Sequence, residues 1–110
     1  MTKIEICQQN GNITKVECSD HAGFADYGKD IVCAGISSIT QTAVLGIKKH
    51  TKIEHNFVID EKKGFLSLEI FDSNVKSQDF HDAQVILKTM FCGLEDLAKQ
   101  YPKYVKLEVK

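Results

Sequence analysis

The dipeptide Asn10-Gly11 constrains the fold most, because it lies between two segments in which apolar and charged residues alternate. Alternation with a period of two is typical of a strand with one buried face, and it is found over residues 3–6 and 14–18. Asn-Gly fits the tight turn that joins two antiparallel strands. The chain is therefore predicted to begin with a β-hairpin, with Thr14 on the buried face of the second strand.

The rest of the chain follows the same scheme of paired strands and apolar-faced helices. Asp30 and Ser77 are expected to cap two helices, and Pro102 is expected to end the second one. The chain is predicted to be a single α+β domain over residues 1–110 in the order ββαββαβ, with a largely antiparallel sheet packed with two helices. The predicted elements are strands over 3–6 and 14–18, a helix over 31–49, strands over 53–59 and 66–70, a helix over 78–100, and a strand over 105–109.

Composition narrows the possible partners and the compartment. The net charge of -1 gives no general electrostatic attraction to nucleic acid or to an anionic membrane. No apolar segment approaches the roughly 18 residues that a membrane span needs, and the amino terminus lacks the pattern of a signal peptide. The 4 cysteines include no C-x-x-C pair and are expected to be free thiols. We therefore expect a cytoplasmic protein that binds neither nucleic acid nor membrane.

His21 and Cys33 are the residues with the clearest chemical potential. If Asp30 caps the helix, Cys33 lies in its first turn, where the free amides and the helix dipole favour a thiolate. The same amides could receive an oxyanion. A glycine-bearing loop could carry His21 back to the helix start, where it would act as the base. This arrangement predicts acyl transfer, and peptide hydrolysis in particular.

Simpler interpretations stay open from the residues alone. Cys33 could be a small buried apolar residue and His21 a surface residue, in which case the protein would be a non-catalytic binding module. Cys18, His21 and Cys33 could instead hold a metal if Cys7 supplied a fourth ligand. Cys18 is expected in the core, and Cys92 is expected to pack beside the buried stripe of the second helix.

The loop over residues 22–29 is expected to contact a substrate. Gly23 and Gly28 allow it to move, so it could close over an extended peptide. Phe24 and Tyr27 lie on this loop rather than on an apolar face. They could contact a substrate, but they could equally anchor the loop to the core.

These residues resemble the ribosomal-processing cysteine protease (Prp) family of bacteria. The match joins a histidine, a helix-capping aspartate and a cysteine at fixed spacing, and the order of strands and helices is similar across nearly the whole chain. The matching segments are His21-Ala22-Gly23, Tyr27-Gly28-Lys29-Asp30-Ile31-Val32-Cys33-Ala34 and Ser37.

The resemblance implies Cys33 as catalytic cysteine and His21 as catalytic histidine, with Asp30 and Ser37 in supporting roles. It implies a cytoplasmic homodimeric endopeptidase that removes the amino-terminal extension of a large-subunit ribosomal protein precursor. No cofactor or metal is expected for such a mechanism. One position departs from the family pattern, because Asp20 stands where a glycine usually precedes the histidine. Aspartate adopts the backbone angles open to glycine less readily, so the start of the loop is expected to be affected.

Overall fold

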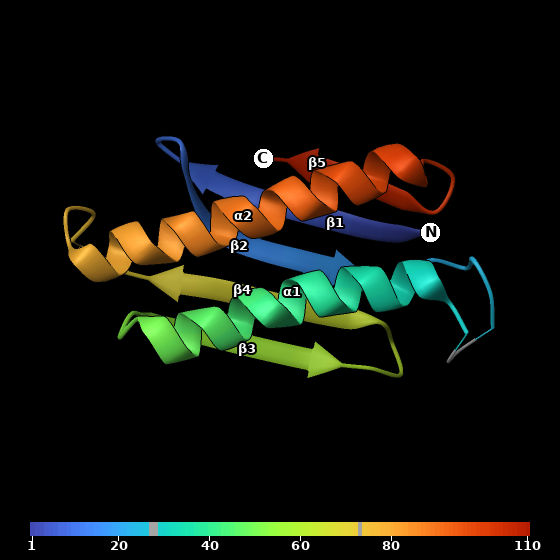
Figure 1. Ribbon diagram of the computed structural model, residues 1–110, viewed down its shortest axis with the longest axis horizontal. Coiled ribbons are helices and arrows are strands. Elements are labelled where there is room, and N and C mark those ends of the chain that lie inside the picture. The colour runs from blue at the N-terminus through green and yellow to red at the C-terminus, as the bar shows by residue number, and fades with distance from the viewer. Residues whose placement is uncertain (27–28, 73) are drawn as a thin grey trace.

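The computed structural model describes residues 1–26, 29–72 and 74–110, which form a five-stranded sheet with two helices across one face (Figure 1). The predicted α+β class and the order ββαββαβ are confirmed. The elements are β1 (Thr2–Gln9), β2 (Asn12–Ser19), α1 (Ile31–His50), β3 (Glu54–Asp60), β4 (Phe65–Phe71), α2 (Gln78–Gln100) and β5 (Val105–Val109).

The sheet has the strand order β3-β4-β2-β1-β5. Neighbouring strands are antiparallel except β1 and β5, which pair in parallel with Thr2 opposite Val105. The parallel pair arises because α2 crosses the sheet between β4 and β5. This topology brings the start of β1, the end of β2, the turn between β3 and β4, and the start of α1 to the same end of the sheet (right in Figure 1).

The Asn10-Gly11 turn is formed as predicted, but the strand that follows it contains an irregularity. Asn10 and Gly11 have φ angles of 52° and 80°, as a type I′ turn requires. The register of β1 with β2 shifts between Cys7 and Gln8, which leaves Thr14 as an extra residue in β2.

The prediction that Thr14 lies on the buried face is wrong, because the bulge turns Ile13 into the core instead. Ile13 is 1% exposed. Its backbone N–H and carbonyl both bond to the buried side-chain amide of Gln84 on α2, at 2.8 Å each. The amide replaces the ladder hydrogen bonds lost at the bulge and fixes α2 on the sheet.

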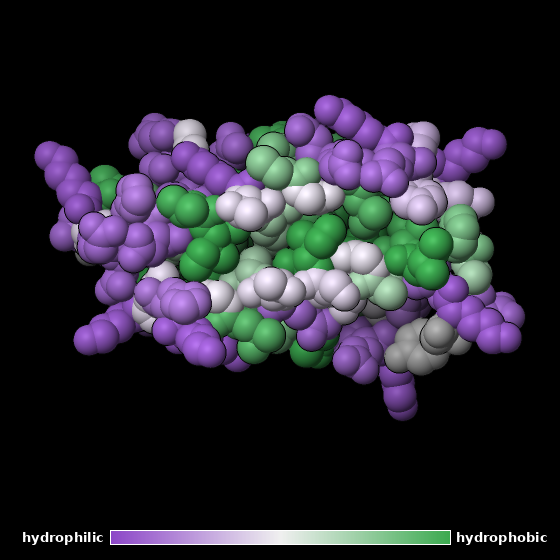
Figure 2. All heavy atoms as spheres, viewed as in Figure 1, coloured by the Kyte–Doolittle hydropathy of each residue, from purple (hydrophilic) through white to green (hydrophobic). Residues whose placement is uncertain are grey.

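Both helices pack on the sheet and on each other through small residues. Gly35 of α1 faces Leu97, and Gly93 of α2 faces Ile39, so neither position has room for a large side chain. Apolar side chains gather along the helical face between polar margins (Figure 2).

In the described part of the chain, α1 is by length and composition apolar enough to cross a membrane. The expectation that no segment approaches that length is therefore wrong. The helix nevertheless has a face buried against the rest of the fold, which includes Val32, Ile36, Val44 and Ile47. A core helix of a folded domain passes the same test of length and composition.

Candidate active site

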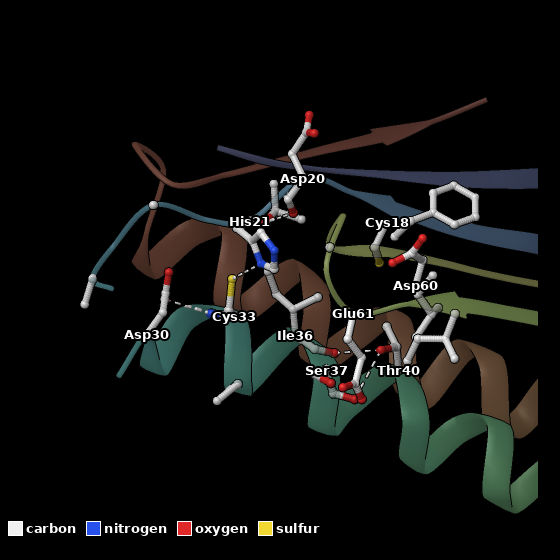
Figure 3. A pocket seen from close by; sticks show the side chains of 18 residues that line it. Cys18, Asp20, His21, Asp30, Cys33, Ile36, Ser37, Thr40, Asp60 and Glu61 are labelled. Carbon is white, nitrogen blue, oxygen red and sulfur yellow. Dashed lines mark hydrogen bonds between the residues drawn. The ribbon is translucent and has the colours of Figure 1, made fainter. Parts of the chain in front are cut away.

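A cavity of about 470 Å³ opens at the end of the sheet where α1 begins (Figure 3). Its walls combine apolar and polar side chains from the sheet, α1 and the loops beside them. The lining includes Cys18, His21, Cys33, Ile36, Ser37 and Leu66. The structure therefore brings together the histidine and the cysteine that the sequence singled out.

The His21 ring faces the Cys33 sulfur across the mouth of the cavity (Figure 3). The distance from Cys33 Sγ to His21 Nδ1 is 3.8 Å. On the other side of the ring, His21 Nε2 lies 3.1 Å from the carbonyl oxygen of Lys62. A carbonyl can only accept a hydrogen bond, so this contact assigns the ring proton to Nε2. Nδ1 then presents its lone pair to the Cys33 thiol.

Asp30 caps α1, as predicted, and also holds the preceding loop. One carboxylate oxygen accepts from the N–H groups of Val32 and Cys33 at 3.0 and 2.9 Å. The other accepts from the N–H of Phe24 at 3.0 Å. Burial alone would raise the pKa of Asp30, but the N–H donors of Cys33 and Phe24 outweigh it and lower the pKa.

The first-turn amides of α1 already donate hydrogen bonds to Asp30. The expectation that they could receive an oxyanion is therefore not supported. Val32 and Cys33 donate to the Asp30 carboxylate, and Ala34 donates to the Asp30 carbonyl at 3.0 Å. In this geometry these amides do not point at an incoming oxyanion. The amide nearest the sulfur is that of Ala22, whose N–H donates to Cys33 Sγ at 3.0 Å.

The Cys33 thiol is also less acidic than its place in the helix predicts. Burial raises its pKa, the Ala22 N–H opposes that shift, and the Asp30 carboxylate adds to the rise. The net direction is upward, so the expected resting thiolate is not supported. A raised pKa favours the protonated thiol, so the reaction needs a base to remove this proton.

The other cysteines lie in different environments. Cys18 is buried as predicted, and burial raises the pKa of its thiol to about 12, so it cannot compete as a nucleophile at neutral pH. Cys92 is exposed, and the prediction that it packs beside the buried stripe of α2 is wrong. Within residues 1–26, 29–72 and 74–110, no three His, Cys, Asp or Glu side chains are placed to hold a metal.

Some of the remaining predicted residues line the cavity and others do not. Ser37 and Gly23 line it, and Ser37 Oγ accepts from the Gln41 amide at 2.6 Å. Phe24 instead packs its ring edge-on against Tyr101 and Tyr104, at centroid distances of 5.8 and 5.3 Å. Of the two roles expected for Phe24, these contacts match the one in which it anchors the loop to the fold.

Two predicted loop residues, Tyr27 and Gly28, lie outside the described residues. Sequence reasoning also missed two contributors to the site, the Lys62 carbonyl and Gly64. Both lie in Glu61-Lys62-Lys63-Gly64, the segment between the predicted strands over 53–59 and 66–70. Nothing in its local pattern indicates that it contacts His21 across the fold.

Comparison with known proteins identifies the family of the chain. The family model described as cysteine protease Prp matches residues 1–106. The chain belongs to the Prp family of cysteine proteases. A ribosomal processing cysteine protease Prp from Staphylococcus aureus (strain Mu50) is 31% identical over 91% of this chain and 90% of its own length. Its counterpart from Bacillus subtilis (strain 168) is 29% identical over 81% and 79%.

The structural likeness covers the whole molecule. The crystal structure of an S. aureus ribosomal processing protease Prp with a covalently linked product peptide matches at a TM-score of 0.88. It is 30% identical, and the match covers 100% of both chains. As a member of this family, the protein is a cysteine protease.

Asp20, the position that departs from the family pattern expected by resemblance, has an unusual backbone conformation. Asp20 has a φ of 68°, in the left-handed region that glycine enters without strain. Its carbonyl accepts a hydrogen bond of 2.9 Å from the Thr2 hydroxyl, which holds the residue in this conformation. Aspartate is among the non-glycine residues that adopt this region most readily, so it is compatible with the backbone conformation found before His21.

Replacing Asp30 tests whether the carboxylate joins the loop to the helix. We expect Asp30→Ala to lower the free energy of unfolding by about 1–2 kcal/mol, because the cap and the Phe24 contact are both lost. Asp30→Asn should be less damaging, because its amide oxygen can still cap. Asp79→Asn, in the first turn of α2, is the matched control and should change stability by less than about 0.5 kcal/mol.

The stabilisation that Asp30 provides is expected to decrease at low pH. The folded pKa of Asp30 is lowered, so its charge stabilises the fold above its unfolded pKa of roughly 3.9. That contribution is lost as the pH falls through the folded value. The stability difference between wild type and Asp30→Asn, measured by urea unfolding, should therefore shrink from about pH 7 to about pH 3. A difference that stays constant would show that the charge of Asp30 is not what stabilises the loop.

Proposed function

We propose that the protein is an endopeptidase in which Cys33 is the nucleophile and His21 the general base and acid. The observation that carries the proposal is the 3.8 Å approach of Cys33 Sγ to His21 Nδ1 at the mouth of the cavity. The Lys62 carbonyl holds the ring proton on Nε2, so the nitrogen that faces the sulfur is the basic one.

The reaction proceeds in two stages. In the first, the Cys33 thiol gives its proton to His21 Nδ1 while the sulfur attacks the scissile carbonyl carbon. The carbon–nitrogen bond then breaks, His21 returns the proton to the leaving amine, and a thioester to Cys33 remains. In the second stage His21 takes a proton from water and the hydroxide attacks the thioester carbon. The carbon–sulfur bond then breaks, His21 returns the proton to the Cys33 sulfur, and the new carboxylic acid is released.

The residues around the pair hold it in place rather than react. Asp30 fixes the first turn of α1 and therefore the position of Cys33. The Ala22 N–H, 3.0 Å from Sγ, stabilises negative charge as it develops on the sulfur. Ser37 and Gly23 line the cavity in which the peptide would lie.

We propose that the substrate is the amino-terminal extension of a large-subunit ribosomal protein precursor. Two lines of support are the names of the related proteins and the product peptide held by the S. aureus relative. An exposed chain terminus suits a cavity that is open to solvent at one end of the sheet. A ribosomal substrate would place the enzyme in the cytoplasm, and a homodimer remains a prediction from the family resemblance.

Incubation with the precursor tests this substrate. We expect intact-mass measurement to show one cut that removes the extension, while the same ribosomal protein without its extension stays uncut. Cys92→Ser should cleave at the wild-type rate, because that thiol is exposed on α2, outside the cavity lining. Stable binding of the precursor without any cut would contradict the proposal and favour a binding module.

A further inference from the structure

The turn between β3 and β4 contacts the His21 segment at two points. The carbonyl of Lys62 lies 3.1 Å from His21 Nε2. Two residues further on, Gly64 packs against the Asp20–His21 peptide. The pairing of Cys18 with Leu66 places this turn beside the end of β2, so the two contacts arise from the sheet register.

Gly64 has no room for a side chain on this surface. A Cβ at this position would lie 2.9 Å from the Asp20 carbonyl carbon and 3.0 Å from the His21 nitrogen. Both atoms are backbone and cannot move aside without displacing His21. Gly64 also has a φ of 62°, which disfavours other residues independently.

We infer that the β3–β4 turn is a positioning element for His21, with Gly64 setting the distance and the Lys62 carbonyl setting the tautomer. The inference rests on the proposed function, because it concerns the base of that reaction. A neutral imidazole can carry its proton on either nitrogen, and the Lys62 carbonyl favours Nε2. A ring protonated on Nδ1 has no lone pair to accept the Cys33 proton.

Glycine is therefore required at position 64 by its contact with the His21 backbone as well as by the turn conformation. Gly11 provides the comparison, because it also sits in a hairpin turn with a positive φ of 80°. A Cβ at Gly11 would meet nothing within 4 Å. The two glycines thus share the backbone strain but differ in contact with His21.

Gly64→Ala and Gly11→Ala, compared in one assay, test the inference. For Gly64→Ala we expect kcat for precursor cleavage to fall at least about tenfold, with KM changed less than about threefold. For Gly11→Ala we expect both constants to stay near wild type. Nitrogen-15 spectra of the imidazole rings, recorded above the titration of the free side chain, should show His21 protonated on Nε2 in wild type. That signal should shift in Gly64→Ala only.

The ring spectra separate failure of this inference from failure of the proposed function. A slower Gly64→Ala enzyme with an unchanged His21 signal would overturn the positioning role. A shifted signal with unchanged cleavage would overturn it too, and would indicate that His21 is not the base at all. If Gly64→Ala does not fold, the wild-type spectrum decides, because a ring protonated on Nδ1 would contradict the Lys62 contact.

Discussion

Replacing Cys33 by serine is expected to reduce kcat for precursor cleavage by at least about 10⁴-fold, the scale seen when a protease loses its nucleophile. The serine hydroxyl occupies nearly the same space at the start of α1, so the cap by Asp30 and the Ala22 contact should survive. A hydroxyl is far less acidic than a thiol, so His21 removes its proton much less readily. Activity should therefore be lost while the unfolding midpoint stays within a few degrees.

The exposed thiol of Cys92 supplies the matched control for this experiment. Cys92→Ser makes the same chemical change on α2 and should leave both cleavage and stability unchanged. Binding of the precursor to Cys33→Ser, measured separately, should remain close to wild type, because the cavity walls are intact. A Cys33→Ser enzyme that retains more than about a tenth of wild-type activity would rule out the sulfur as the attacking group.

The fold was predictable because its signals are local. The Asn10-Gly11 turn, the alternation along the strands and the caps at Asp30 and Ser77 each act within a few residues. The bulge at Thr14 was not predictable, because its reason is the long-range bond from Gln84 to the Ile13 backbone. The prediction that no apolar segment approaches membrane-spanning length fails at α1, whose serines and threonines interrupt its apolar residues without adding charge.

The site was predictable only in part, for a related reason. The cap at Asp30 placed Cys33 in the first turn, the glycine-bearing loop could bring His21 to it, and the resemblance implied the same pair. The acidity of the thiol could not be predicted from the sequence, because burial and the Asp30 carboxylate, which raise its pKa, depend on the folded structure. The Lys62 carbonyl is a backbone group that any residue could supply, so no residue type marks it.

Replacing His21 by alanine is expected to have the second large effect on activity. The pH dependence of that loss tests whether His21 removes the Cys33 proton. We expect kcat/KM to fall by about 10³–10⁴-fold near neutral pH, because the imidazole that faces the Cys33 sulfur is removed. The pKa of Cys33 is raised by burial, so little thiolate forms without a base. In His21→Ala the remaining activity should depend on that small thiolate fraction. It should rise about tenfold per pH unit below the thiol pKa.

The wild-type enzyme does not depend on a spontaneous thiolate in this way, so the defect of His21→Ala should shrink as the pH rises. Measuring precursor cleavage for both enzymes from about pH 6 to about pH 9.5 gives the ratio directly. His81→Ala removes an exposed imidazole from α2 and should match wild type throughout. A ratio that does not change with pH would contradict proton removal by His21. In that case its loss would act through the position of the Asp20–His21 backbone, which Gly64 and Thr2 hold in place.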